Sequence, residues 1–479
     1  MTESTIGRNR LANALDRHRT GLLVGSAMGV YVLVLLGATT SILSGAPACP
    51  TWPTCNGSLV SLGSPAVALA WGHRVLGILV GVLIATTWVA IHRHGSRRQR
   101  RTLTAAAVLY PVQAAMGAYI AVRGPTQMLA ATHLTVAMVI FTGHLVTLLW
   151  HLESEHGRPD PADGREPRSL ENPSTDGDAV TPDRPRRDRV GPLDRARAYV
   201  RMTKPRLMWL LALVAMAAMG LAAGPALEGG TIVATIAGGV LAIGASGTFN
   251  HVLERDRDRR MSRTADRPVA TDAIPPRRAL AFGAALGVLS TAVFLVFVNP
   301  LAAALGVLAI LFYTVVYTVV LKPHTEHNTV LGGAVGAFPA LIGWAAVTEG
   351  MGMPAVALGL VVFLWTPAHF YNLALAYETD YARAGYPMLP VVAGEATTRR
   401  HILGYLGGTL AAAVLLGTAT ELGWLYALAN AVLGAVFVVA VVHQFRERTE
   451  SAAFRSFHAS NAYLGIVLLA IVFDTLLVA

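Results

Sequence analysis

The chain has 479 residues, of which 54% are hydrophobic and only 14% are charged, and its mean hydropathy is +0.51. This composition excludes a soluble globular protein and places the chain in a lipid bilayer. A net charge of +10 is compatible with nucleic-acid binding, but the basic residues fall in alternate loops between apolar stretches, where they set membrane orientation. We therefore expect no nucleic-acid partner.

Apolar stretches long enough to cross a membrane recur along nearly the whole chain. A helix needs about 20 mostly apolar residues to cross a hydrocarbon core of roughly 30 Å. The sequence therefore predicts an all-α integral membrane protein with about 13 transmembrane helices, four before residue 152 and nine after residue 205. They are expected at 21–44, 67–91, 102–122, 129–151, 206–224, 231–249, 277–297, 300–320, 328–348, 354–372, 402–421, 423–443 and 461–479.

Basic residues alternate between the two sides of these helices. The opposite loops, around 225–230, 298–300, 349–353 and 422, carry no Lys or Arg, and Arg123 is the only clear basic residue on that side. The positive-inside rule predicts a multi-pass protein of the cell membrane with its N-terminus in the cytoplasm and its C-terminus outside. The first apolar stretch is long enough to be a retained helix rather than a cleaved signal peptide. The side assigned to the cytoplasm receives Arg8, Arg10, Arg17, Arg19, His92 to Arg101, the 250–276 loop, Lys322, Arg383, Arg399, Arg400, Arg446, Arg448 and Arg455.

A polar segment divides the chain. Between residues 152 and 198 the apolar pattern stops, and Asp, Glu, Arg, Pro and Ser dominate. Such a composition cannot offset chain entropy by burial, so we expect a disordered cytoplasmic linker. The predicted domains are a four-helix membrane unit at 1–151, the linker at 152–198 and a nine-helix membrane domain at 199–479.

The loop after the sixth predicted helix carries the clearest chemical pattern. Asn250, Glu254 and Asp258 are spaced i, i+4 and i+8, so they share one face if the preceding helix continues. Oxygen ligands of this kind suit Mg²⁺ shared with substrate phosphates, and Arg263 and Arg267 supply positive charge for the same phosphates. The alternative is a solvated loop that is rich in both signs of charge. That alternative explains the arginines, but it does not explain the helical spacing of the acids.

Two further segments belong on the same predicted membrane side. The first runs from Trp365 to Pro390 and contains Glu378 and Asp380, either of which can share the metal and diphosphate site. The second contains Lys322, which either meets phosphate or is an ordinary basic residue of a cytoplasmic loop.

These stretches make the chain from about Lys204 onward resemble the UbiA prenyltransferase superfamily and, within it, the protohaem IX farnesyltransferases, or haem O synthases. The matching stretches span about 275 residues in the family's order. They are Thr203 to Arg206, Asn250 to Thr264 with Arg267-Pro268, Tyr317 to Thr325 leading into Gly332-Gly333, Gly336 to Pro339, Ile342 to Trp344, and Trp365 to Pro390.

The resemblance implies an all-helical UbiA-type bundle of nine spans around a central cavity. It also implies magnesium-assisted ionisation of farnesyl diphosphate and attack by a vinyl group of haem B, which gives haem O. Metal and arginine would stabilise the leaving diphosphate, and a cavity that excludes water would protect the allylic cation.

Site residues follow from the matched positions. Metal ligands are expected at Asn250, Glu254, Asp258 and Asp380, and Asp256 is a substitute because the family usually has Asp where this chain has Glu254. Asn250, Asp258, Arg263 and Asp380 are the expected catalytic residues. The expected diphosphate ligands are Lys204, Arg206, Arg263, Arg267 and Lys322.

Two polar residues of the tenth predicted helix are candidates for the haem acceptor site. His369 is expected near a cytoplasmic helix end, where an imidazole can ligate or orient haem iron, and Asn372 lies one turn further on. The alternative is that they are polar residues satisfied inside the bundle.

The N-terminal unit contains the only two cysteines, Cys49 and Cys55, in the loop after the first helix on the predicted outer side. A disulfide is favoured over a metal site, which would need further ligands. His73 and His133 begin two helices that run in the same direction, at similar depth. Such a pair suits bis-axial haem ligation, although single buried histidines are more often only hydrogen bonded.

Residues 20 to 151 resemble one half of haem A synthase, through the paired cysteines, His73-Arg74 and His133-Leu134. That family has Glu where this chain has Ala70, and its bacterial members have two such halves. Either a partner such as a haem A synthase supplies the rest, or the unit binds or passes haem.

Two other functions remain open at this point. The chain is either a UbiA-type enzyme with another acceptor, such as a quinone precursor, or a non-catalytic haem-binding or transport protein. Charged motifs confined to loops argue against a transport pathway, and the segment from Trp365 to Pro390 favours haem as the acceptor.

Overall fold

The computed structural model describes residues 18–42, 48–55, 57–58, 63–156 and 191–478. Within these residues every regular element is a helix, apart from an isolated β-bridge between Cys55 and Ser58. Thirteen of the described helical segments are long and apolar enough to cross a membrane. This confirms the predicted all-α, multi-pass membrane fold and its number of spans.

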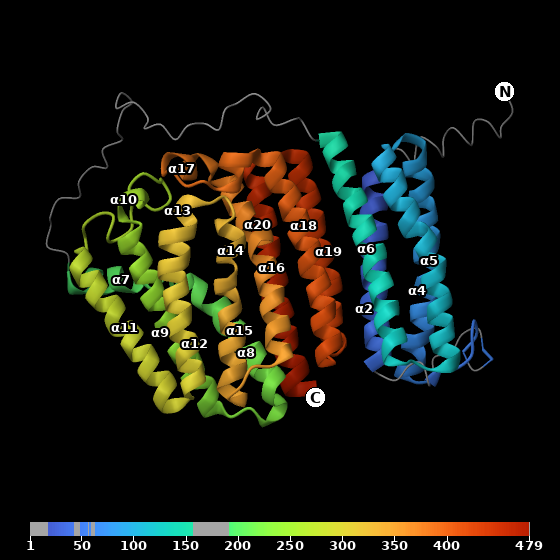
Figure 1. Ribbon diagram of the computed structural model, residues 1–479, viewed down its shortest axis with the longest axis horizontal. Helices are drawn as coiled ribbons and strands as arrows, with labels where there is room; N and C mark the ends of the chain where they lie inside the picture. The colour runs from blue at the N-terminus through green and yellow to red at the C-terminus, as the bar shows by residue number, and fades with distance from the viewer. Residues whose placement is uncertain (1–17, 43–47, 56, 59–62, 157–190, 479) are drawn as a thin grey trace. The chain divides into compact units, whose positions relative to one another are not determined.

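The chain forms two compact units, which are drawn in Figure 1. Unit 1 contains the described residues before 157 together with Ile402–Asp474 and Val478, and unit 2 contains the described residues from 191 to His401 with Thr475–Leu477. The edges of the predicted linker are helical, but its residues 157–190 lie outside the described part of the chain. The division into three domains at 152 and 198 stays a prediction.

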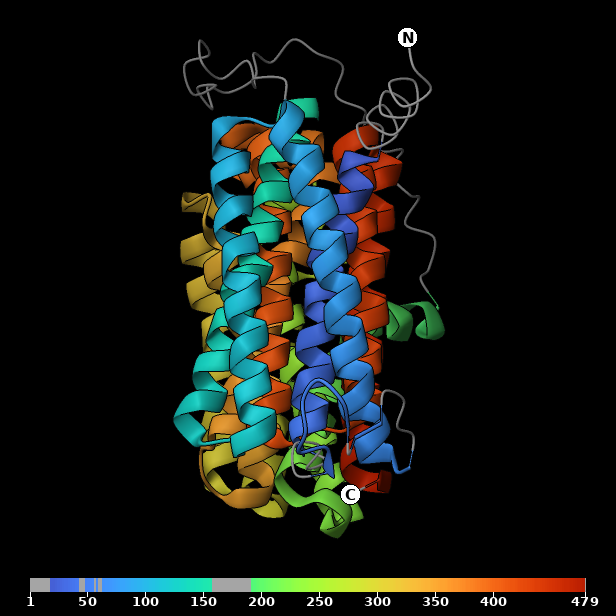
Figure 2. The same cartoon turned by 90° about the vertical axis from the view of Figure 1, so that its right-hand side faces the viewer.

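Unit 1 holds the first four spans and the last three. Helix α2 packs against α4, α6 and α19, and α4, α5 and α6 lie side by side in Figure 2. The hydroxyl of Tyr31 on α2 donates to the carbonyl oxygen of Leu410 on α18, 3.3 Å away. The helices are α2 (Arg19–Ile42), α4 (Pro65–His94), α5 (Arg97–Arg123), α6 (Gln127–His156), α18 (Leu389–Thr420, from Ile402), α19 (Trp424–Glu447), α20 (Glu450–Phe473) and the two ends of η4 (Asp474–Val478), whose middle belongs to unit 2.

Two of these helices begin well before the spans expected at 402–421 and 461–479. Helix α18 begins at Leu389, with a kink at Gly394 where φ is 84°, and α20 begins at Glu450. Their extra turns carry charged residues, and in α18 an ion pair joins Arg399 to Glu395 one turn earlier. Such turns are helical without being apolar, so hydropathy alone could not register them.

Unit 2 is built on α9, which packs against α11, and on α8, which packs against α15. Its helices are α7 (Pro192–Met202), α8 (Pro205–Ala223), η2 (Gly224–Ala226), α9 (Gly229–Leu253), α10 (Arg255–Asp258), α11 (Pro276–Phe297), α12 (Pro300–Leu311), the π-helix η3 (Phe312–Leu321), α13 (Lys322–His324), α14 (Asn328–Gly332), α15 (Ala334–Thr348), α16 (Met353–Ala376), α17 (Glu378–Arg383) and the start of α18.

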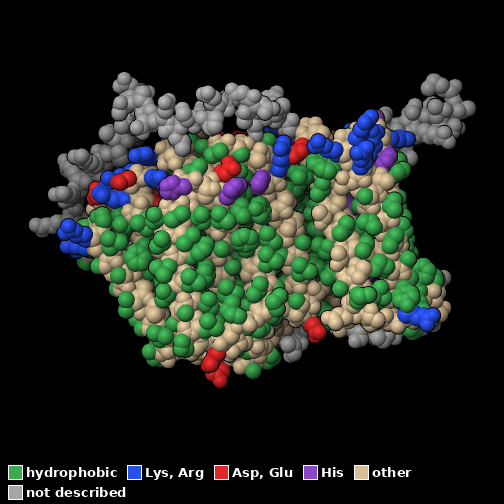
Figure 3. Space-filling view, in the orientation of Figure 1, with side chains coloured by type: hydrophobic (Ala, Val, Ile, Leu, Met, Phe, Trp, Pro, Cys, Tyr) green, Lys and Arg blue, Asp and Glu red, His purple; other side chains and the backbone are tan. Residues whose placement is uncertain are grey.

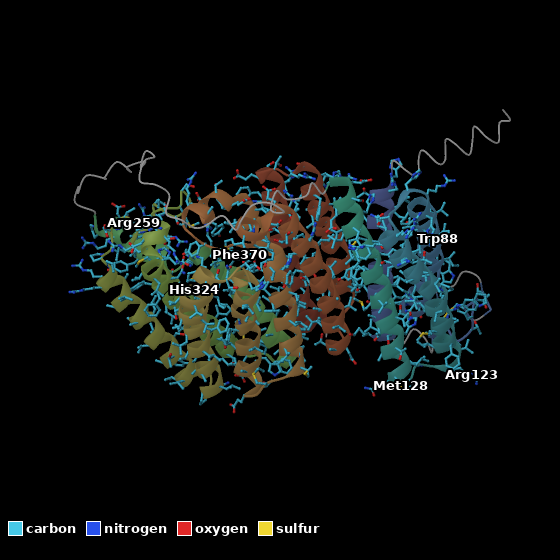
Figure 4. All side chains as sticks on the ribbon, turned by 45° about the horizontal axis from the view of Figure 1, so that its top comes forward. Trp88, Arg123, Met128, Arg259, His324 and Phe370 are labelled. Carbon is cyan, nitrogen blue, oxygen red and sulfur yellow. A yellow bond between two sulfur atoms is a disulfide. The ribbon has the colours of Figure 1, made fainter. Side chains whose placement is uncertain are left out.

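The sides of the spans are covered by apolar side chains, as expected for a protein whose solvent is hydrocarbon (Figure 3). Val233, Val288 and Val296 are each at least 70% exposed. In unit 2 the charged side chains gather at the end that carries α10, α13 and α17. Arg259 and His324 both lie at this end, which Figure 4 turns toward the viewer. We call it the charged end.

Candidate active site

The segment that enters α8 has an unusual backbone. Proline at the first position of a helix starts it well, and Pro205 takes this place in α8. Lys204 just before it has φ of 58° and ψ of 54°, a left-handed conformation that residues other than glycine seldom adopt. In α9, Gly247 leaves room for this segment, because a Cβ there would lie 2.9 Å from the carbonyl oxygen of Met202. The Lys204 side chain is thereby held against α9.

A hydrogen-bonded network joins Lys204 to two other spans. Its ammonium group donates to Asn250 Oδ1 at 2.5 Å and to the Tyr313 hydroxyl at 2.9 Å. The side-chain amide of Asn250 donates to Thr318 Oγ1 at 3.2 Å. Tyr313 and Thr318 belong to η3, and π-helical turns within α-helices often mark functional sites. The network ties together α8, α9 and η3.

Two buried carboxylates lie next to this network. Glu254 directly follows α9 and Asp258 ends α10, and the two residues are 3% and 2% exposed. Arg267 donates through one nitrogen, Nη1, to both carboxylate oxygens of Asp258, each at 2.8 Å, and the same nitrogen lies 3.7 Å from Glu254. Lys322 forms an ion pair with Glu254. The two carboxylates therefore face a shared set of cations.

We call Lys204, Asn250, Glu254, Asp258, Arg267 and Lys322 the charged cluster. Its three cations outnumber its two carboxylates, so it keeps a positive charge that favours an anionic ligand. The helical spacing of Asn250, Glu254 and Asp258 does bring their side chains together. The chain bends at Glu254, between α9 and α10, without separating them.

Burial and neighbouring charges perturb the pKa values of the cluster. Burial alone would raise the pKa of Glu254, but Lys322 and then Lys204 outweigh it and lower that pKa to about 2. For Asp258, burial outweighs the Arg267 guanidinium, so its pKa is raised. Burial, followed by repulsion from Arg267, lowers the pKa of Lys204 to about 7. Lys204 therefore changes its charge near neutral pH.

The segment around α17 meets the segment after α10, as the sequence predicted. Ser262 donates to both carboxylate oxygens of Asp380, at 2.9 and 2.8 Å, and the backbone N–H of Arg263 donates to the same group at 3.1 Å. The Arg263 guanidinium lies 5.0 Å from the ring centre of Tyr377 and donates to the Tyr381 hydroxyl at 3.2 Å. Asp380 thus fixes the turn that carries Arg263.

Aromatic residues complete the site, and sequence reasoning assigned them no role. Lys322 lies 4.5 Å from the ring centre of Tyr386, and Arg257 packs against the same ring at 4.8 Å. Tyr313 binds Lys204 directly. Tyr313 stands inside an apolar run, where nothing in the local pattern distinguishes it from a core residue.

Four predicted residues do not join the charged cluster: Asp380 and Arg263, which contact each other as described above, and Asp256 and Arg206. Asp256 was expected to substitute for Glu254, but its side chain is 82% exposed and its nearest ion-pair partner is Arg259, at 3.9 Å. The reason is geometric, because Asp256 lies two residues from each clustered acid and points the other way. Arg206 is likewise exposed on the first turn of α8, two residues after Lys204.

The donor set fits a magnesium ion that is completed by substrate, but not a cage made of protein ligands alone. Among the described residues no three His, Cys, Asp or Glu side chains are placed to share a metal ion. The cluster offers two carboxylates and the amide oxygen of Asn250. Mg²⁺ is commonly held by one or two carboxylates plus waters and substrate phosphates, which this set can provide.

An apolar chamber with about 800 Å³ of empty space, part of it open to the outside, begins at the charged cluster. Lys204 and Tyr313 stand at its polar end, and apart from Thr235 and Ser246 the remaining lining is apolar. It is lined by Lys204, Leu207, Leu211, Ala212, Ala215, Thr235, Ile236, Gly239, Val240, Ala242, Ile243, Ser246, Gly247, Ala309, Tyr313, Val335, Phe338, Pro339 and Ile342. The chamber suits an apolar chain whose anionic head lies in the cluster.

The two residues predicted for the acceptor lie on α16. The imidazole of His369 stacks on Trp365, with ring centres 4.3 Å apart and an angle of 13° between the planes. The amide of Asn372 is fully buried and donates to the carbonyl oxygen of Ala368 at 2.7 Å, while its Oδ1 accepts no hydrogen bond from the described residues. Their role toward the acceptor stays a prediction.

In unit 1, His73 of α4 and His133 of α6 form what we call the histidine pair. The rings lie near enough to interact electrostatically. Each ring packs against a glycine of another helix, where an added Cβ would be 3.0 Å from His73 at Gly37 and 3.3 Å from His133 at Gly117. The Nδ1 atom of each ring is buried without a hydrogen-bond partner among the described residues. Such unpaired polar atoms are unusual in buried positions.

The loop before α4 is closed by a disulfide between Cys49 and Cys55, which packs on Val67 and Ala70. Arg74, next to His73, holds this loop. Its guanidinium donates to the carbonyl oxygens of Thr51 at 2.7 Å, Thr54 at 2.8 Å and Cys49 at 2.7 Å. In the sequence, Arg74 stood out only as part of the His73-Arg74 dipeptide. Its contacts with the loop could not be predicted, because its hydrogen-bond acceptors are backbone carbonyl oxygens and leave no mark in the sequence.

Comparison with known proteins agrees with both resemblances. The UbiA prenyltransferase family matches residues 210–466, and a family described as cytochrome oxidase assembly protein matches residues 20–172. The protoheme IX farnesyltransferase of Haloarcula marismortui is 54% identical over 97% of this chain and 99% of its own length. That of Halobacterium salinarum is 52% identical over 95% of this chain and 98% of its own.

Among solved structures, a digeranylgeranylglyceryl phosphate synthase aligns with a TM-score of 0.50 and 17% identity, over 59% of this chain and 99% of its own, which shows the fold alone. The family match over more than half of the chain and the full-length relatives together decide the assignment. This chain belongs to the UbiA prenyltransferase family.

Proposed function

We propose that the chain transfers a farnesyl group from farnesyl diphosphate to haem B, with uptake of water and release of diphosphate, to give haem O. The observation that carries this proposal is the position of the charged cluster at the polar end of the apolar chamber. A prenyl diphosphate has the same two parts, an anionic head and an apolar tail. The full-length relatives carry the name protoheme IX farnesyltransferase, which supports the choice of donor and acceptor.

The cations of the cluster would bind the diphosphate by changing partners. In the structure Lys322 is paired with Glu254, and Arg267 with Asp258. Phosphate oxygens are equally good acceptors for these donors, and Lys204 adds a third cation. As the leaving group departs, its growing negative charge would be met by donors already in place, which is the largest source of rate enhancement in many enzymes.

The residues that would hold Mg²⁺ are Glu254, Asp258 and Asn250, and the ion would supply charge neutralisation of the diphosphate. The two carboxylates are free for this role once Lys322 and Arg267 turn to phosphate. Asp380 acts as a positioning residue, because its hydrogen bonds fix the turn of Ser262 and Arg263.

The bonds that form and break in the proposed transfer can each be accounted for. The bond between C1 of the farnesyl group and oxygen breaks, and its electron pair leaves with the diphosphate. The terminal carbon of a haem vinyl group bonds to C1, and a water oxygen adds to the vinyl carbon beside the ring and loses one proton. The chamber would keep bulk water from the allylic cation, and the Tyr313 ring at its mouth offers a π-face.

The haem acceptor would lie against α16, which carries His369 and Asn372. Both residues precede Asp380 of α17 in the sequence by the length of two helical turns or more. The stacked rings of Trp365 and His369 offer a flat surface, and an imidazole can ligate or orient haem iron.

We also assign the charged end of unit 2 and the N-terminus to the cytoplasm, and the C-terminus to the outside. The gathering of Lys and Arg at the charged end supports this orientation.

A second function, haem binding by unit 1, is favoured by the histidine pair. Two half-buried imidazoles whose buried Nδ1 atoms have no hydrogen-bond partner among the described residues, each seated against a glycine, suit axial ligation of a haem. Position 70 carries alanine packed on the disulfide, so the carboxylate found there in haem A synthases is lacking. Unit 1 would therefore bind haem or pass it to a partner such as a haem A synthase, rather than oxidise it.

The proposed function is tested by asking which acceptor the chain prenylates. The purified chain with farnesyl diphosphate and Mg²⁺ is given either haem B or a quinone precursor such as 4-hydroxybenzoate, and products are identified by mass spectrometry. We expect haem O from the first mixture and no prenylated product from the second. The reverse result would make the quinone precursor the acceptor. If neither acceptor gave a product, the hypothesis of a non-catalytic haem-binding or transport protein would be favoured instead.

A further inference from the structure

Two stripes of residues set the depth of the apolar chamber. On α9 the lining runs from Gly247 at the charged cluster down to Thr235, and on α8 it runs from Lys204 down to Ala215. With a helical rise of about 1.5 Å per residue, these stripes are roughly 18 Å and 16 Å long. Both begin at the charged cluster, so they measure the depth available to a tail that extends from a bound diphosphate.

The lower end of the chamber is closed by helix packing. At Ala215, α8 and α15 are in contact, because a Cβ added to Gly343 of α15 would lie 2.3 Å from the carbonyl oxygen of Ala215. Thr235 is 1% exposed, and its hydroxyl has no hydrogen-bond partner among the described residues. Ile342 lines the chamber at the same level as Ala215. A longer tail would have to separate α8 from α15.

An extended prenyl chain can be compared with this depth. Each five-carbon unit lengthens the chain by about 5 Å at ordinary carbon–carbon bond lengths, so three units need about 15 Å and four about 20 Å. Three units fit the chamber and four do not.

Gly239 leaves the lower part of the chamber open. It lines the chamber eight residues below Gly247, about 12 Å along the helix, and an added Cβ would meet no atom within 4 Å. Its neighbour Gly238 differs, since a Cβ there would lie 2.8 Å from the Phe294 ring of α11. Gly238 serves helix packing, whereas a side chain at Gly239 would enter the space for the third five-carbon unit.

We propose that the floor formed by Thr235 and Ala215 limits the donor to three five-carbon units, and that Gly239 is the residue that admits the third. This inference rests on the proposed prenyl transfer and adds to it the determinant of chain length. It assigns a specificity role to a glycine and a threonine that take no part in the charged cluster.

The experiment compares geranyl, farnesyl and geranylgeranyl diphosphates as donors to haem B, with kcat/KM measured for each. Gly239→Leu is expected to lower the value for farnesyl by about 100-fold and to leave geranyl within about threefold, so that the shorter donor becomes preferred. Ala237→Leu is the matched control, because Ala237 lies two residues away on α9 with its side chain exposed, and it should leave the order of donors unchanged.

Two further variants keep the test decisive if Gly239→Leu does not fold. Gly239→Ala should lower the farnesyl-to-geranyl ratio by about tenfold, and Thr235→Ala should raise the geranylgeranyl-to-farnesyl ratio by a similar factor. An unchanged order of donors in all the folded variants would overturn the length limit while leaving transfer by the unsubstituted chain intact. Failure of the proposed function would look different, because the unsubstituted chain would then make no haem product from any donor.

Discussion

The charged cluster and the histidine pair both bury polar groups, but they satisfy them differently. In the charged cluster each carboxylate has a cationic partner, Lys322 for Glu254 and Arg267 for Asp258. In the histidine pair the Nδ1 atoms of His73 and His133 have no partner among the described residues. A buried network that satisfies itself is rigid and must exchange partners to bind a ligand, whereas an unsatisfied pair gains hydrogen bonds or ligation when a ligand arrives.

This difference predicts two kinds of sensitivity to mutation. Removing one partner from a buried ion pair leaves the other charge unpaired, so changes in the charged cluster should affect both the chemistry and the local structure. Removing an imidazole that has no partner leaves a smaller side chain and no orphaned charge. The histidine pair should therefore tolerate substitution in folding while losing its ligand.

The largest effect is expected in the charged cluster, for Asp258→Ala. It removes a proposed metal ligand and the closest ion-pair partner of Arg267, so kcat/KM for haem O formation should fall by at least about 100-fold. The matched control is Asp256→Ala on the same short helix, whose carboxylate is 82% exposed. Its activity should stay within about twofold of the unsubstituted chain. Undiminished activity of Asp258→Ala, with product measured by mass spectrometry, would remove Asp258 from the site.

In the histidine pair, His73→Ala and His133→Ala should each weaken haem binding by about 10- to 100-fold, read from the absorption spectrum of the low-spin haem. Farnesyl transfer measured with excess haem B should change little, because these residues lie in unit 1. His94→Ala, at the opposite end of α4, is the control and should leave the spectrum intact. An unaltered low-spin spectrum in both pair variants would show that the haem has other ligands.

An intermediate effect is expected from pH, through Lys204. Its pKa of about 7 means that the ammonium form, which attracts diphosphate, is lost as the pH rises through that value. At pH 8 only about one tenth of Lys204 is protonated, so the KM for farnesyl diphosphate should rise by up to about tenfold between pH 6 and 8. Lys204→Arg should flatten this rise because arginine stays charged. The same pH dependence in Lys204→Arg would place the titration on another group.

The smallest effect concerns Arg74, which links the disulfide loop to the helix of His73. Arg74→Gln should speed reduction of the Cys49–Cys55 disulfide by dithiothreitol about 5- to 10-fold, because the loop loses hydrogen bonds to three carbonyl groups. Arg123→Gln, at the C-terminal end of α5, should leave the rate unchanged. Equal rates in Arg74→Gln and the unsubstituted chain would mean that the loop is held by its packing alone.

Most of the fold could be predicted because hydropathy and helical spacing are local properties. Thirteen apolar stretches gave thirteen spans, and the spacing of Asn250, Glu254 and Asp258 placed three side chains in one cluster. The early starts of α18 and α20 were missed because charged residues, such as Arg399 in α18 and Arg455 in α20, lie between these starts and the apolar spans.

The rest of the site depends on how the helices cross. Which cation pairs with which carboxylate, and the meeting of Tyr313 with Lys204, depend on contacts between α8, α9 and η3. The chamber has no pattern of its own, since its lining looks like any apolar helix face. Helical spacing placed Asp258 on the face of Asn250 and Glu254, but Asp256, expected as a substitute ligand, points outward.

The most direct test of the charged cluster is to count both products of a single reaction. The purified chain is given haem B and farnesyl diphosphate, with or without Mg²⁺, and haem O and released diphosphate are measured together. We predict equal amounts of the two, formed only with Mg²⁺, by the unsubstituted chain and Asp256→Ala but not by Asp258→Ala. Diphosphate released without haem O, or equal yields from Asp258→Ala, would contradict transfer at this cluster.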